Sequence, residues 1–137
     1  MKNTLIAVAF CASALALVAP LSAAGLNDQN KHFLTAYEQA HQSLAADDLA
    51  GAQKAGAEFG PSGTDLTKSK SLEEARAAFE KLSARATELA AGQPGYFLLH
   101  CPMAKKHWVQ TSDKPSNPYF GKQMAGCGEV QAQTPAK

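Results

Sequence analysis

Apolar residues recur at intervals of three and four along three stretches between residues 27 and 92, a spacing that places them on one face of an α-helix. Capping residues precede each stretch: Asn27-Asp28, Asp47-Asp48, and Ser71 with Glu74 three positions later. Glycine and proline end the last two stretches at 60–63 and 92–95, and a polar linker runs to about residue 70. The predicted helical stripes are Phe33, Leu34, Tyr37, His41 and Leu44; Leu49, Ala52, Ala55 and Phe59; and Leu72, Ala75, Phe79, Leu82, Ala86 and Leu89.

The helical period stops after Gly95. Residues 96–99, Tyr-Phe-Leu-Leu, form an apolar run with room for one strand or extended segment. Residues 100–130 are rich in Pro, Gly, Asn and Lys, and the polar residues 131–137 are predicted to be a disordered tail. We therefore predict a mainly α fold, a small antiparallel three-helix bundle with an irregular C-terminal motif segment, 96–130, that contains a short extended run.

The first 24 residues have the order of parts of a secretory signal peptide. Lys2 supplies positive charge, an apolar stretch of 14 residues runs from Leu5 to Val18, and Ser22-Ala23-Ala24 place small side chains at cleavage spacing. A helix of that length is too short for a hydrocarbon core about 30 Å thick. We predict a signal peptide at 1–24, export to the periplasm, no membrane anchor after cleavage, and one helical domain over residues 25–130.

Charge argues against two broad classes of partner. Cleavage would remove Lys2 from the thirteen basic residues and none of the twelve acidic ones, which leaves a formal charge of zero. Proteins that bind nucleic acid or anionic lipid electrostatically carry an excess of Lys and Arg on the binding face. We expect neither partner.

Sulfur-bearing side chains gather in two short segments, 100–103 (His-Cys-Pro-Met) and 124–127 (Met-Ala-Gly-Cys). The Cys and Met of the first share a side in an extended chain, and those of the second share a side in a helical turn. Thiolate and thioether ligands favour Cu(I) over hard ions. If the segments meet, the predicted metal ligands are Cys101, Met103, Met124 and Cys127, with His100 as an optional further donor and His107 near enough in sequence to add an imidazole.

A disulfide is the competing fate of the same cysteines. Cys11 lies within the predicted signal peptide, so Cys101 and Cys127 remain, and two cysteines in an oxidising compartment pair by default. The bridge would contribute about 3 to 4 kcal/mol in the chain-entropy model and would remove both thiolates from a metal site. Met103 and Met124 would then serve equally well as core fillers.

The sequence has no recognised catalytic motif. It contains no Cys-x-x-Cys, His-Glu-x-x-His, Gly-x-Ser-x-Gly or phosphate-binding glycine loop. His100 and Cys101 are adjacent, but neighbouring side chains of an extended strand point to opposite faces. We predict that the protein is not an enzyme.

The C-terminal motif resembles a bacterial protein family. The likeness rests on Cys101-Pro102-Met103, on Trp108, and on the pattern Asn-Pro-Tyr-x-Gly-x-x-Met-x-x-Cys-Gly over residues 117–128. The family resembled is a periplasmic domain family of formally unknown function, found alone after a signal peptide or joined to adaptor subunits of copper and silver efflux pumps. The resemblance implies handling of a soft metal, copper, with the four sulfur side chains as ligands and a heavy-metal efflux adaptor as a candidate partner.

These observations lead to one leading hypothesis and one alternative. The leading hypothesis is a periplasmic, non-enzymatic Cu(I)-binding or copper-tolerance protein. The alternative is a structural or interaction module stapled by a Cys101–Cys127 disulfide, with no metal site, that presents the turn at Tyr119-Phe120 to a partner such as an efflux adaptor. The stretch 104–107 is shorter and more basic than in many family members, and it sets two lysines beside the proposed cation site.

Overall fold

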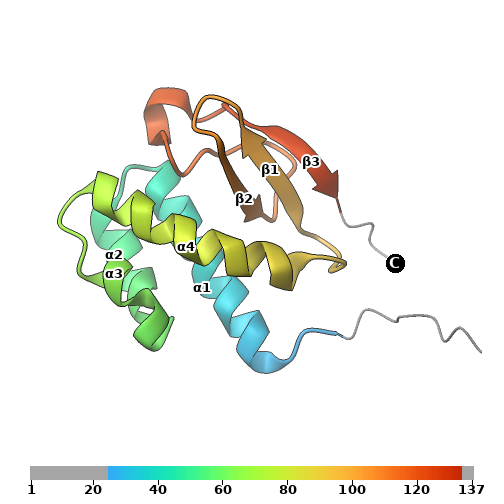
Figure 1. Ribbon diagram of the computed structural model, residues 1–137, viewed down its shortest axis with the longest axis horizontal. Helices are drawn as coiled ribbons and strands as arrows, with labels where there is room; N and C mark the ends of the chain where they lie inside the picture. The colour runs from blue at the N-terminus through green and yellow to red at the C-terminus, as the bar shows by residue number, and fades with distance from the viewer. Residues whose placement is uncertain (1–24, 134–137) are drawn as a thin grey trace, which may run out of the picture.

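The computed structural model describes residues 25–133, so the predicted signal peptide and residues 134–137 lie outside the described part. Helices form one layer and a small sheet packs against them (Figure 1). Within residues 25–133, no helix is both long and apolar enough to cross a membrane. The elements are α1 (Asp28–Ala45), α2 (Leu49–Ala57), the 3₁₀ turn η1 (Gly60–Gly63), α3 (Thr64–Thr67), α4 (Leu72–Ala90), β1 (Phe97–Cys101), β2 (Lys106–Gln110), the 3₁₀ turn η2 (Gly121–Met124) and β3 (Glu129–Gln133).

The predicted caps at the starts of α1, α2 and α4 are confirmed. Asn27, Asp48 and Ser71 each accept a hydrogen bond from the backbone N–H three residues further on, at 2.8, 2.9 and 3.1 Å. Each bond satisfies one of the backbone donors that a helix start leaves free. The Glu74 carboxylate accepts from the backbone N–H of Lys70 at 2.7 Å, one residue before the position that a capping box uses.

Three antiparallel strands in the order β2-β1-β3 form the sheet, and β2 lies beside α4 (Figure 1). The turn at 102–105 sets the register of β1 and β2, which places His100 opposite His107. On β3, Glu129 also lies opposite His100, and the register shifts between Leu98 and Leu99. Residues directly opposite one another share a face of the sheet, and neighbours along a strand alternate. His100, His107 and Glu129 therefore lie on one face and Cys101 on the other.

The predicted three-helix bundle with an irregular C-terminal segment is wrong. The described residues form an α+β fold with four α-helices and a three-stranded antiparallel sheet. The additional helix, α3, lies in the stretch predicted as a polar linker and buries Leu66 completely. β3 extends to Gln133, so residues 131–133, assigned to the tail from the sequence, belong to the sheet.

The missed strands lack the signals that identify strands in a sequence. Lys105 has a φ of 54° in the β1–β2 turn, where a hairpin usually reveals itself by Gly or Asn. β3 reads Glu-Val-Gln-Ala-Gln and contains a single large apolar side chain. Its place depends on hydrogen bonding to β1, and no local pattern of apolar residues indicates it.

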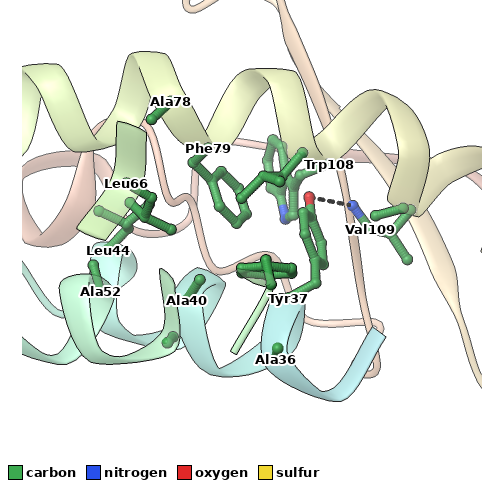
Figure 2. Close-up of a cluster of buried hydrophobic side chains, with 14 of the residues drawn as sticks. Ala36, Tyr37, Ala40, Leu44, Ala52, Leu66, Ala78, Phe79, Trp108 and Val109 are labelled. Carbon is green, nitrogen blue, oxygen red and sulfur yellow. Dashed lines mark hydrogen bonds between the residues drawn. The ribbon is translucent and has the colours of Figure 1, made fainter. Parts of the chain in front are cut away.

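Aromatic rings from the helices, β2 and the C-terminal segment meet in one core. Tyr37 of α1 stacks on Phe79 of α4 with ring centroids 4.6 Å apart, and Figure 2 shows both beside Trp108 of β2. Tyr119 meets Phe79 and Trp108 edge-on, at centroid distances of 6.0 and 6.2 Å. Such pairs contribute about 0.5 to 1.5 kcal/mol each beyond the burial of their area. The predicted helical stripes are confirmed as core, apart from Leu49, Leu72 and Leu89, which are half-buried.

Three hydroxyl groups connect the helices to β2 inside this core. Ser83 Oγ lies 2.7 Å from Tyr37 Oη and 3.1 Å from Tyr119 Oη. The Tyr119 hydroxyl donates to the carbonyl of His107 at 3.1 Å, and Tyr37 Oη accepts from the backbone N–H of Val109 at 3.4 Å (Figure 2). Burial raises the pKa of Tyr119 to about 12 and that of Tyr37 well above its ordinary value. Both phenols therefore stay neutral and keep their donor hydrogens.

Arg76 of α4 joins the C-terminal segment to the helices. Its Nε donates to the carbonyl of Pro118 at 2.9 Å, and Nη2 donates to the carbonyl of Leu44 at 3.2 Å and to Asp47 Oδ1 at 2.6 Å. Asp47 Oδ2 accepts from the backbone N–H of Lys122 at 3.1 Å. Gly121 has a φ of 59°, and a Cβ there would collide with the Asp47 carboxylate and the Arg76 guanidinium. Glycine is the residue that adopts this positive φ without strain and has no Cβ to collide with its neighbours.

Gly121→Ala should destabilise the protein, because the new methyl group meets the ion pair and the left-handed backbone is unfavourable for alanine. We expect a loss of about 2 kcal/mol or more in the free energy of unfolding, measured by urea denaturation of the chain that begins at Gly25. Gly126→Ala is the matched control, since a Cβ at Gly126 has no heavy atom within 4 Å. Equal losses in both variants would contradict the role of Gly121.

The Asp47–Arg76 pair should make stability depend on pH. The hydrogen bond from Arg76 and the backbone hydrogen bond from Lys122 lower the pKa of Asp47 below its ordinary value of 3.8. Because the folded pKa is the lower one, the contribution is complete above the unfolded pKa and is lost as pH falls through the folded pKa. Measured by urea denaturation across this range, the stability difference between the wild type and Asp47→Asn should shrink as pH falls below 3.8. The same measurement on Asp113→Asn, at an exposed loop residue, should show no such convergence.

Candidate functional site

The two cysteines of the motif meet at the end of β1. Cys101 is the last residue of β1, Cys127 lies three residues after η2, and their Cα atoms are 5.8 Å apart. A disulfide joins the two sulfur atoms. Cys101 is fully buried and Cys127 is half-buried. The sequence left open whether these cysteines form a disulfide or two thiolate ligands, and in the structure they form the disulfide.

The two methionines flank the disulfide in different environments. Met103 lies in the β1–β2 turn with 67% of its surface exposed. Met124 ends η2 and is half-buried, and its carbonyl accepts from the backbone N–H of Cys127 at 3.0 Å. Met103 is too exposed to be a core filler. Both thioethers belong to short segments that the disulfide holds together.

His100 lies on the other face of β1. Its ring faces that of His107 on β2, with centroids 4.4 Å apart and an angle of 31° between the ring planes. His107 is exposed and His100 is half-buried. Of the five predicted ligands, Cys101 and Cys127 form the disulfide, and Met103 and Met124 belong to the two short segments that it joins. His100 lies apart from them, beside His107.

Asn117 organises the segment that carries Cys127, a role that its place in the 117–128 motif did not indicate. Its Oδ1 accepts from the backbone N–H groups of Tyr119 and Phe120 at 2.8 and 3.0 Å, and its Nδ2 donates to the carbonyl of Cys127 at 2.7 Å. The backbone N–H of Asn117 also donates to the carbonyl of Ala125 at 2.9 Å. The Asn-Pro pair indicates a turn in the sequence, but the contact ten residues away has no local signal.

The donor set fits a soft ion only after reduction. In the part of the chain that the structure describes, no three His, Cys, Asp or Glu side chains gather as a metal site. Two thiolates that bind one ion at about 2.3 Å each lie about 4 Å apart, a separation that cysteines with Cα atoms 5.8 Å apart can reach. Lys106, opposite Cys101 in the sheet, forms an ion pair of 2.5 Å with Glu80. That pair offsets one of the two positive charges nearest the proposed site.

Comparisons with protein-family models, with curated proteins and with solved structures find no match to this chain. A fold does not by itself assign a function. The side chains at the end of β1 are therefore the features of this chain that bear on its function.

Reduction of the disulfide should weaken the protein. The bridge spans a sequence separation of 26 residues, and opening such a loop costs about 3.5 kcal/mol in the chain-entropy model. Urea denaturation with and without a phosphine reductant measures this difference. The double variant Cys101→Ser/Cys127→Ser is the control and should not respond to the reductant. An unchanged unfolding midpoint for the wild type would show that the bridge does not support the fold.

Proposed function

We propose that the protein is a non-enzymatic, periplasmic protein that binds Cu(I) and serves in copper tolerance. The observation that supports this most directly is that two sulfur-bearing segments, 101–103 and 124–127, meet at their cysteines, whose Cα atoms are 5.8 Å apart. Sulfur donors of both types are the ligands that Cu(I) prefers. The predicted signal peptide supplies the route of export.

Binding in this proposal requires the reduced protein. A thiol reductant transfers two electrons to the Cys101–Cys127 disulfide, and two protons complete the two thiols. Cu(I) then displaces these protons and is bound by two thiolates, with the thioethers of Met103 and Met124 as further ligands. A disulfide oxidant that accepts two electrons from the two thiolates re-forms the Cys101–Cys127 bridge and releases the ion. The disulfide is the resting state of the site in this scheme.

The exposure of Met103 supports a role in capture and transfer of the ion. Met103 lies in a turn with 67% of its surface in water, so it makes few packing contacts. Its sulfur can therefore bind an ion with little loss of packing energy. Neutral thioethers are weaker ligands than thiolates, so an ion held there exchanges readily. The surface thioether would receive Cu(I) and pass it to the thiolates of Cys127, which is half-buried, and Cys101, which is buried. The ligand set consists of the four sulfur atoms, because His100 lies on the opposite face of β1.

The alternative function is a structural or interaction module, and the burial of Cys101 favours it. The disulfide links the segment at 111–128 covalently to the end of β1, where Cys101 is buried. Tyr119 and Phe120 are both half-buried, and both line a surface cavity together with Ala77 and Ala104. The hydroxyl of Tyr119 is already engaged with the carbonyl of His107, whereas the ring of Phe120 has no hydrogen-bonding group to satisfy. In this alternative Phe120 meets a protein partner such as an efflux adaptor, and no metal binds.

A Cu(I) titration separates the two functions. The chain from Gly25 is purified without reductant, its free thiols are counted, and Cu(I) is titrated against a chromophoric chelator before and after reduction. The copper proposal predicts no free thiols and weak binding at first, then tight one-to-one binding after reduction. Cys101→Ser should abolish tight binding, because a single thiolate remains. A reduced wild type that competes no better than Cys101→Ser would favour the structural module.

Met103→Leu tests the thioether separately. The change conserves volume at an exposed position and should leave the free energy of unfolding within about 0.5 kcal/mol of the wild type. If Met103 is a ligand, the reduced variant should lose about tenfold in Cu(I) affinity, which corresponds to about 1.4 kcal/mol. Val130→Leu is the matched control, since Val130 is also an exposed apolar residue. Equal affinity of all three proteins would remove Met103 from the ligand set.

A further inference from the structure

The pair formed by His100 and His107 is a candidate site that the sulfur chemistry does not use. The two residues are directly opposite each other on β1 and β2, and their ring centroids are 4.4 Å apart. Within residues 25–133, neither imidazole takes part in a hydrogen bond or an ion pair. Their nitrogen atoms are therefore available to a ligand from solvent.

Two imidazoles at this separation are suited to one transition-metal ion. An ion that binds two imidazole nitrogens at about 2.0 Å holds them about 3 Å apart. Rings whose centroids are 4.4 Å apart can bring one nitrogen each to that separation by rotation about their side-chain torsions. The paired strands fix the two Cα positions, so the second imidazole binds within the same molecule and raises the affinity for the ion.

The geometry points to a binding site for divalent copper at His100 and His107, on the face of the sheet opposite the disulfide. Imidazole is a good ligand for Cu, Ni and Zn, and among divalent first-row ions Cu(II) binds a given site most tightly. Two protein nitrogens leave the other positions of the ion to water. The carboxylate of Glu129 lies opposite His100 on β3 and is exposed, so it adds negative charge on the same face.

This site is independent of the proposed Cu(I) function. His100 and Cys101 are neighbours on β1, and their side chains lie on opposite faces. The imidazole pair needs no reductant, because neither ligand takes part in the disulfide. Cu(II) binding should therefore occur in the oxidised protein, in which the sulfur site has no thiolates.

The test is a titration of the oxidised protein with cupric chloride in a buffer that does not bind copper, followed by electron paramagnetic resonance. The wild type should bind one Cu(II), and the spin-echo modulation should contain the combination lines of two imidazole nitrogens on one ion. His107→Gln should lower the affinity about 100-fold, the order of magnitude gained by intramolecular binding, and should leave the modulation of one imidazole at most. His100→Gln should do the same.

Two controls make the outcome decisive. His32→Gln removes an exposed histidine that lies 3.4 Å from Glu58, and it should leave the affinity and the modulation unchanged. Cys101→Ser/Cys127→Ser should also retain the two-imidazole signal, whatever the result with Cu(I). Loss of the signal in the cysteine variant with an intact circular dichroism spectrum would place the copper at the sulfur segments. Two-imidazole modulation that persists in His100→Gln/His107→Gln, or its absence from the wild type, would overturn the proposal.

Discussion

The segment that follows β2, residues 111–128, depends on the guanidinium group of Arg76 for its attachment to the helices. The guanidinium accepts no hydrogen bond and donates three, to a carbonyl at the end of α1, to the carboxylate of Asp47 and to the carbonyl of Pro118. The Asp47 carboxylate then holds the backbone of Lys122. A segment with little regular structure is thereby fixed to the helices by charge-assisted hydrogen bonds, which are stronger than neutral ones.

The positions of the sulfur atoms follow from this attachment. Asn117 closes the turn that Arg76 anchors and donates to the carbonyl of Cys127 at 2.7 Å. The disulfide completes a closed path from α4 through the segment to β1. In the reduced protein, Arg76 and Asn117 would still hold Cys127 near Cys101. Under the Cu(I) proposal, their polar contacts would supply the preorganisation that a metal site built from distant parts of the chain requires.

The three longer helices and the extended run of β1 could be predicted from the sequence, whereas the short helix α3 and the strands β2 and β3 could not. Phe33, Leu34, Tyr37 and Phe79 recur at helical spacing and are buried, because a helix face is a local property of the chain. β2 depends on a turn in which Lys105 takes an unusual backbone conformation, and β3 on pairing with β1 some thirty residues earlier. For the site, the proximity of Cys101 and Cys127 could be predicted from their chemistry. The contacts of Arg76 and the hydrogen bond from Asn117 to Cys127 are non-local and leave no pattern in the sequence.

Alternation along β1 separates two kinds of chemistry that the sequence places side by side. His100 and Cys101 read as one group of donors, yet a strand turns neighbouring side chains to opposite faces, so they cannot share one ion. Imidazole accepts divalent ions in any redox state of the protein, whereas the cysteines bind a metal only as thiolates. Under the proposals above, oxidising conditions, which favour Cu(II), leave the imidazole face competent, and reducing conditions, which favour Cu(I), also open the sulfur face. The protein would thus match its donor atoms to the oxidation state of the copper by the position of a single residue along a strand.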